Sequence, residues 1–188
     1  MTTTKIAVFA SGSGSNFQAI QEAIERGELD AKVELVVTDK PSAFVVTRAI
    51  HFGIPVHTFT AKLYESKEAY EEEIVQLLRE KKVEWIVLAG YMRLIGNTLL
   101  AAYPNRIVNI HPSLLPSFPG KDAIGQAIDH GVKVTGVTVH LVDEGMDTGP
   151  ILAQSAVEVV DGNREETETR IHAVEHELYT KTLNQLFK

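Results

Sequence analysis

The sequence contains no cysteine, and this absence removes several kinds of chemistry at once. Disulfide bonds, thiolate nucleophiles and cysteine-based metal sites are all excluded. Apolar runs long enough to span a membrane are also missing. The residues before the first apolar run do not form the basic segment and small-residue cleavage site of a signal peptide. From these absences we expect a cytoplasmic protein without a membrane partner.

Positive charge is also scarce, with 18 Lys and Arg against 25 Asp and Glu, for a formal net charge of −7. This balance argues against a nucleic-acid partner, which would favour a basic surface. It does not argue against a small phosphorylated ligand, because backbone amides bind phosphate without any net positive charge. The 188 residues, 44% of them hydrophobic, are typical of one globular domain, or at most two. We take residues 1–188 as a single domain.

Short apolar runs alternate with helical patterns along most of the chain. Five of these runs are strand candidates, at residues 6–10, 33–37, 54–59, 85–89 and 106–111. Strands without polar alternation are typical of parallel sheets with both faces covered. Two later strands, 137–142 and 151–159, are joined by a short loop and therefore predict an antiparallel pair. With amphipathic helices at 65–82 and 164–187, the pattern predicts a three-layer α/β/α fold, with a Rossmann-like, mostly parallel but mixed sheet of about seven strands.

Proteins with parallel sheets bind their ligands at the carboxyl ends of the strands. The loop that follows the first predicted strand of this chain is rich in glycine and serine. Glycine lets the backbone approach a ligand closely, and the following helix N-terminus favours an anion. We therefore predict a phosphate-binding loop made of Gly12, Ser13, Gly14, Ser15 and Asn16. The alternative is a tight turn with Asn16 as a simple helix N-cap. The loop matches neither the dinucleotide fingerprint nor the P-loop.

A second group of residues suggests acid–base chemistry. Strand side chains repeat with a period of two, so Asn109 and His111 should project from the same face before Pro112 ends the strand. Asp147 lies in a glycine-rich loop that can curl back towards them. An amide stabilises an oxyanion, an imidazole moves protons near neutral pH, and a carboxylate favours the imidazolium. Taken singly, His111 is better explained as a core histidine and Asp147 as a turn residue.

Of three weaker candidates, the first two are better explained by structure alone, and spacing does not decide the third. Ser113 lies in a turn and is not part of a nucleophile elbow, which disfavours a serine hydrolase. His172 and His176 have the spacing of metal ligands on a helix, but no third ligand is evident. Residues 92–95 either pack against the core at the end of a strand or form an apolar wall for a flat ligand. In the second case Arg93 would lie near the polar end of that ligand.

Taken together, the motifs resemble the glycinamide ribonucleotide formyltransferase family, folate-dependent enzymes of purine synthesis. The resemblance rests on G-S-G-S-N at 12–16, A-G-Y-M-R at 89–93, N-I-H-P-S-L-L-P at 109–116 and D-T-G-P at 147–150. The third motif is specific for folate-dependent formyltransferases in general, and the first points to this family among them. The resemblance covers essentially the whole chain and implies the formyltransferase fold.

The resemblance also implies a reaction and a set of residues. The formyl group of 10-formyltetrahydrofolate would pass to the amine of 5-phosphoribosylglycinamide without a metal. Matching positions imply a catalytic trio of Asn109, His111 and Asp147, a phosphate loop at 12–16, and contact of Glu175 with the ribonucleotide. The folate pocket would contain Lys67, Met92, Arg93, Leu94, Ile95, Asn109, Asp143 and Glu144. Lys67 stands where the family can have arginine, and the 120–123 loop lacks the histidines of some members.

Several alternatives stay open at this point. A formyltetrahydrofolate hydrolase would share the trio but transfer the formyl group to water. Methionyl-tRNA formyltransferase would need a further RNA-binding domain and a basic surface. A non-catalytic, Rossmann-type nucleotide-binding module would use residues 12–16 but not His111. The lack of cysteine and of an activated serine favours direct attack by the amine over a formyl-enzyme. We expect small-molecule partners only, and a monomer or homodimer.

Overall fold

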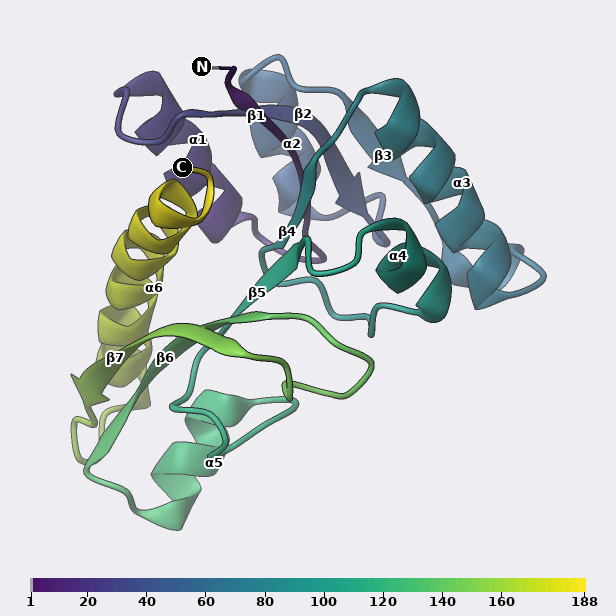
Figure 1. Cartoon of the computed structure of the whole chain (residues 1–188). Helices are drawn as coiled ribbons and strands as arrows, with labels where there is room; N and C mark the ends of the chain where they lie inside the picture. The colour runs from purple at the N-terminus through teal and green to yellow at the C-terminus, as the bar shows by residue number, and fades with distance from the viewer. Residues whose placement is uncertain (1) are drawn as a thin grey trace.

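The computed structural model describes residues 2–188 and shows one seven-stranded sheet between two layers of helices (Figure 1). The strands in chain order are β1 (Thr4–Phe9), β2 (Ala31–Thr38), β3 (Val56–Thr58), β4 (Trp85–Leu88), β5 (Ile107–His111), β6 (Val134–Leu141) and β7 (Ile151–Glu158). They are arranged in the order β3-β2-β1-β4-β5-β6-β7. The pairs among β1 to β5 are parallel, and β6 and β7 join antiparallel. The predicted mixed sheet is thus confirmed.

Six α-helices connect and cover the strands within residues 2–188. They are α1 (Ser15–Glu25), α2 (Phe44–His51), α3 (Lys67–Glu80), α4 (Asn97–Ala102), α5 (Ala123–His130) and α6 (Arg164–Leu186), with a 3₁₀ turn η1 (Ala61–Leu63) before α3. The sequence pattern predicted α3 and α6 but assigned no helix to α4 or α5. Helices of six and eight residues are too short to show a clear period, and they depend on tertiary packing for their stability.

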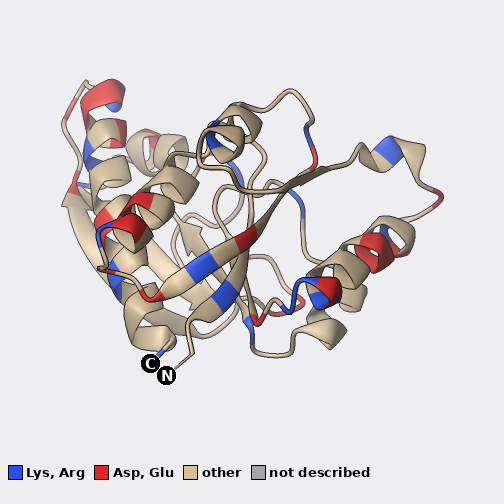
Figure 2. Ribbon diagram, turned by 90° about the horizontal axis from the view of Figure 1, so that it is seen from above, with Lys and Arg blue, Asp and Glu red and all other residues tan. Residues whose placement is uncertain are grey.

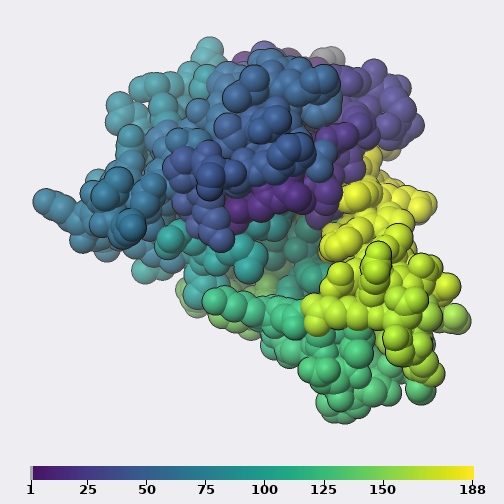
Figure 3. Space-filling model, turned by 180° about the vertical axis from the view of Figure 1, so that it is seen from behind, coloured from purple at the N-terminus to yellow at the C-terminus, as the bar shows by residue number. Residues whose placement is uncertain are grey.

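Alternate residues of β1 enter two separate cores because strand side chains point to opposite faces. Ile6 and Val8 pack with α1, α2 and α6 on one face, and Phe9 packs with α3 and α4 on the other. Long helix α6 is fixed through Tyr179, whose buried hydroxyl donates to the carbonyls of Leu88 at 2.7 Å and Val108 at 3.2 Å. Figure 3 shows α6 in yellow beside the purple N-terminal segments that it contacts.

The order of the strands reverses beside β1, which pairs with β2 on one side and β4 on the other. Such a switch point leaves a crevice between the loops at the carboxyl ends of the two strands. The amide of Ser11 donates across it to the carbonyl of Gly90 at 3.0 Å. Acidic and basic residues are interspersed on the helices and loops around the sheet (Figure 2). In the part of the chain that the structure describes, no helix is both long and apolar enough to cross a bilayer.

Candidate active site

A cleft of about 520 Å³ opens at this edge of the sheet and joins loops that are far apart in the sequence. Most of the predicted site residues line it: Gly12, Ser13, Gly14, Ser15, Asn16, Met92, Arg93, Leu94, Ile95, Asn109, His111, Asp143, Asp147 and Glu175. Lys67 and Glu144, which were expected in the folate pocket, are not among the lining residues. Lys67 lies at the start of α3 beside Gly96, and Glu144 is exposed.

The glycine-rich loop enters α1 in a conformation that only glycine adopts readily. Gly14 has a φ of 77°, and a Cβ built on it would lie 2.6 Å from a Val45 side-chain carbon of α2. The guanidinium of Arg48 donates to the Ser13 carbonyl at 2.7 Å and also to Gln18. The first amides of α1 have no acceptor within the helix, because none precedes them at the required spacing. The loop therefore offers free backbone donors beside a positive side chain.

Asn16 is not the N-cap of α1. Gly14 occupies the cap position without a side-chain cap hydrogen bond, and Asn16 lies inside the first turn. Its Nδ2 donates to the buried carboxylate of Glu175 on α6 at 3.2 Å. His172 contacts the same Glu175 oxygen through Nδ1 at 3.2 Å, and this hydrogen bond raises the pKa of His172. The structure thus brings Asn16 and Glu175 together, although 159 residues separate them.

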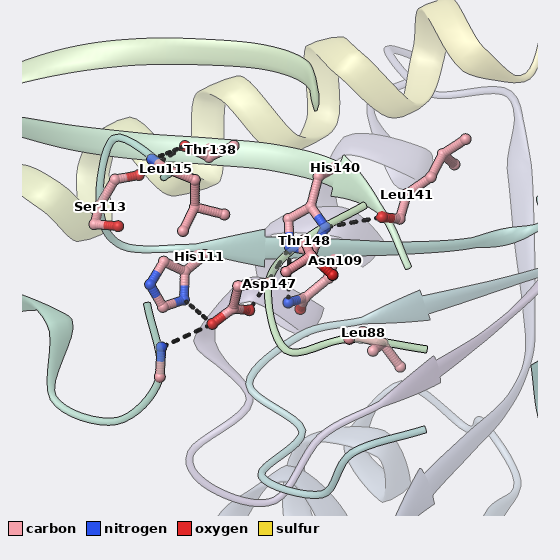
Figure 4. A network of polar contacts seen from close by, with 12 residues as sticks. Leu88, Asn109, His111, Ser113, Leu115, Thr138, His140, Leu141, Asp147 and Thr148 are labelled. Carbon is pink, nitrogen blue, oxygen red and sulfur yellow. Dashed lines mark hydrogen bonds and ion pairs between the residues drawn. The ribbon is translucent and has the colours of Figure 1, made fainter. Parts of the chain in front are cut away.

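The side chains of His111 and Asp147 lie next to each other and point toward one another (Figure 4). His111 Nδ1 lies 3.6 Å from Asp147 Oδ2, and both side chains are largely buried. His111 Nε2 is 2.9 Å from the Phe118 carbonyl, so Nε2 must carry a proton, because a carbonyl oxygen can only accept. Asp147 Oδ2 also accepts from the amide of Gly120 at 2.8 Å. The arrangement leaves Nδ1 of His111 as the atom that can take up and return a proton beside a carboxylate.

A fourth polar residue of the site, His140, was missed by sequence reasoning. It stands opposite Asn109 in the antiparallel pairing of β5 and β6. Its Nδ1 donates to the Leu141 carbonyl at 2.9 Å, which leaves the neutral ring with Nε2 as acceptor for Asn109 Nδ2 at 3.4 Å. Nε2 also lies 3.8 Å from Asp147 Oδ1. The alternating pattern of 137–142 placed His140 on one face, but only the pairing register identifies its partner.

The wall of the cleft is supported by a hydrogen-bond network in which Ser11 and Asp39 are buried, and sequence reasoning assigned neither of these two residues to the site. Ser11 Oγ donates to Asp39 at 2.6 Å and accepts from the amide of Met92 at 2.9 Å. Asp39 also accepts from Arg93 Nε at 3.0 Å. Met92, Leu94 and Met146 line the cleft, although about half of each side chain is exposed. Exposed apolar side chains inside a cleft suit a flat, partly apolar ligand.

Of the weaker candidates, residues 92–95 and His172 line the cleft, whereas Ser113 and His176 lie outside it. Ser113 Oγ donates to the Ser117 carbonyl at 2.6 Å, as a turn residue does. His176 lies outside the cleft, in a groove between α1 and α6, and burial lowers its pKa. Among residues 2–188, no three His, Asp or Glu side chains are grouped in a way that could hold a metal ion.

Fold and site together define the class of protein. A Rossmann-like sheet carries a switch-point cleft that is lined by a glycine-rich loop and by the amide of Asn109, the imidazoles of His111 and His140 and the carboxylate of Asp147. Such a cleft is typical of α/β enzymes that bind anionic ligands and move protons.

Comparisons with known proteins identify the family. Residues 4–183 match the family described as formyl transferase. The chain is 57% identical to phosphoribosylglycinamide formyltransferase of Bacillus subtilis, over 97% of this chain and 94% of that protein. The crystal structure of glycinamide ribonucleotide transformylase 1 from Geobacillus kaustophilus matches with a TM-score of 0.96 and 58% identity, over 99% of this chain and 100% of that one. The chain belongs to the formyl transferase family.

Proposed function

We propose that this protein transfers the formyl group of 10-formyltetrahydrofolate to the amine of 5-phosphoribosylglycinamide in purine synthesis. The observation that carries the proposal is the single cleft joining the 12–16 loop to Asn109, His111 and Asp147. Relatives named for this reaction, at 57% and 58% identity over almost the full chain, support it. We take residues 1–188 as one domain, with small-molecule substrates, a cytoplasmic location, and a monomeric or homodimeric state.

In this proposal the 12–16 loop binds the phosphate of the acceptor, and Glu175 contacts the rest of the ribonucleotide. The folate lies against Met92 to Ile95 and the loop that begins at Asp143. These two groups of residues line the same cleft, so both substrates can be held in register. Positioning two reactants in this way accounts for a large share of the rate in group-transfer reactions.

The proposed chemistry is direct attack of the acceptor amine on the formyl carbon. A carbon–nitrogen bond forms, and Asn109 Nδ2 and the protonated Nδ1 of the His111 imidazolium donate to the oxyanion that develops on the formyl oxygen. Asp147 gives the imidazolium of His111 an anionic neighbour, and a proton passes from the attacking amine to the folate nitrogen. The bond to that nitrogen then breaks, releasing tetrahydrofolate. The lack of cysteine supports this route over a thiol-bound formyl intermediate.

One assay tests the proposal against its alternatives. The protein is given 10-formyltetrahydrofolate with and without 5-phosphoribosylglycinamide, and release of tetrahydrofolate is followed. We expect release only when the acceptor is present, with one formylated acceptor for each tetrahydrofolate. Release without the acceptor would identify a hydrolase, and binding without release would identify a non-catalytic module.

A further inference from the structure

Both members of the proposed acid–base pair are held by one loop, which follows β5 and covers residues 112–120. The Phe118 carbonyl accepts from His111 Nε2 at 2.9 Å. The Gly120 amide donates to Asp147 Oδ2 at 2.8 Å. The orientation of His111 and Asp147 therefore depends on the path of the 112–120 loop, which contains no helix or strand of its own.

The start of this loop is fixed by a single hydroxyl from β6. Thr138 is fully buried, and its Oγ1 donates to the Ser113 carbonyl at 2.7 Å. The same oxygen accepts from the Leu115 amide at 3.0 Å, a contact visible in Figure 4. The loop also packs tightly on β6, where a Cβ added to Gly136 would lie 2.6 Å from the Leu114 side chain. Thr138 thus fixes the direction in which the chain leaves β5.

The neighbouring strand completes this arrangement through Gln154 of β7, the residue paired with Thr138 in the sheet register. Gln154 Nε2 donates to Thr138 Oγ1 at 3.0 Å and to the Leu115 carbonyl at 2.9 Å. The hydroxyl of Thr138 now uses its donor and both acceptor positions, and Leu115 has both backbone groups bonded. Because the Thr138 hydroxyl at the centre of the network is buried and fully bonded, the network specifies one conformation of the segment that it holds.

None of the side chains in this network lines the cleft. We propose that Thr138 and Gln154 are positioning residues, which hold the 112–120 loop so that it orients His111 and Asp147 for formyl transfer. The inference rests on the proposed function, in which these two side chains carry out the chemistry. The inference gives Gln154 a role in turnover, although this exposed residue of the edge strand β7 does not contact either substrate.

The test measures kcat and both KM values for Thr138→Val, Thr138→Ser and Gln154→Met. Valine keeps the shape of threonine but removes the hydroxyl, serine restores the hydroxyl, and methionine removes the amide while keeping the length of the side chain. We expect the valine and methionine variants to lower kcat by roughly ten- to a hundredfold, because small displacements of catalytic groups are costly. Both KM values should change by less than about threefold, because neither substitution removes a group that contacts a substrate. Thr138→Ser should recover most of kcat.

Thr167→Val provides a matched control. Thr167 is also fully buried, and its Oγ1 donates to the Asn163 carbonyl and accepts from the Val160 amide, both at 3.0 Å. It lies in α6 outside the cleft, so its loss should lower thermal stability while kcat is kept. Equal losses of kcat in Thr138→Val and Thr167→Val would overturn the positioning role. Because Gln154 is exposed, Gln154→Met provides the decisive measurement if Thr138→Val does not fold.

His111→Ala, measured alongside, separates the two proposals. If His111→Ala is slow while folded Gln154→Met turns over like the wild type, the positioning role is wrong and the proposed site stands. If His111→Ala itself turns over like the wild type, the proposed site is wrong and the inference fails with it.

Discussion

At the scale of single residues, the site depends on which atom of each side chain faces which partner. Asn109 could present its amide in two ways, but the acceptor nitrogen of His140 selects the one in which Nδ2 faces β6. The Phe118 carbonyl similarly decides which nitrogen of His111 carries its proton in the neutral ring. The sequence supplied these residue types, and backbone carbonyls and a cross-strand neighbour determined their orientation.

The first prediction concerns the proposed oxyanion donors. Asn109→Ala and His111→Ala should each lower kcat on the order of a hundredfold or more, because each removes a preorganised donor to the developing charge. Steady-state turnover with both substrates measures the effect. His51→Ala, an exposed histidine at the end of α2, serves as the control and should match the wild type. Near-wild-type turnover in both site variants would contradict the assignment.

The second prediction concerns pH and the two histidines of α6. The hydrogen bond that His172 donates to Glu175 raises the pKa of His172 above its ordinary value of 6.5, so protonation favours the folded state. The stabilisation of the folded state by protonated His172 should be complete below about pH 6.5. It should be lost as pH rises through the pKa of His172 in the folded protein. Burial lowers the pKa of His176, so its contribution should be present above about pH 6.5 and lost as pH falls.

Melting temperatures of His172→Gln and His176→Gln, compared with wild type across this range, test both signs. The deficit of His172→Gln should be largest at low pH and shrink as pH rises. His176→Gln should gain on the wild type as pH falls. Parallel pH curves for the three proteins would contradict the proposed charge states.

At the scale of elements, the glycine-rich loop shows how a turn and two helices are fitted together. Helix α1 begins where Gly14 adopts a left-handed conformation against Val45 of α2. The Val45 amide in turn donates to the Gly12 carbonyl at 3.1 Å. A β-carbon at Gly14 would displace α2 or distort the backbone at the start of α1. The conformation of the loop and the packing of α1 against α2 therefore depend on the same residue.

The third prediction follows from this constraint. Gly14→Ala should lower the free energy of unfolding by about 1–3 kcal/mol, since alanine is strained at positive φ and collides with Val45. Gly12→Ala should change it by less than about 0.5 kcal/mol, because a β-carbon at Gly12 meets nothing within 4 Å. Urea titration measures both values. Equal stability of the two variants would be inconsistent with the packing described.

At the scale of the whole molecule, α6 connects the C-terminal segment to the centre of the sheet. The middle of the helix presents Glu175 and His172 to the cleft, and one turn further along Tyr179 is bonded to carbonyls of β4 and β5. These are the two strands whose ends carry the 90–95 and 112–120 loops. The helix that supplies part of the site therefore also joins the strands that supply the rest.

The fourth prediction tests this connection. Tyr179→Phe should lower the free energy of unfolding by about 1–2 kcal/mol, because two carbonyls lose a buried donor. Tyr64→Phe removes an exposed hydroxyl that bonds to Glu73 and should change stability by less than about 0.5 kcal/mol. Both are read from urea unfolding. A Tyr179→Phe protein as stable as Tyr64→Phe would show that the hydroxyl does not fix α6.

What could be read from the sequence was what local patterns encode. Apolar runs without alternation gave the parallel strands, and period two placed Asn109 and His111 on one face. Glycine at 14 and the residue types of the family motifs located the loops of the cleft. These features depend on neighbours within a few positions, so composition and spacing are enough to reveal them.

Folding decided what depends on register and on contacts across the sheet. The antiparallel pairing of β5 and β6 placed His140 beside Asn109, and the antiparallel pairing of β6 and β7 placed Gln154 beside Thr138. The return of the 143–150 loop brought Asp147 to 3.6 Å from His111, and the packing of α6 brought Glu175 to Asn16. Lys67, by contrast, lies outside the cleft lining. No local pattern encodes these contacts, because each is fixed by which strand or helix lies beside which, and that follows only when the entire core is packed.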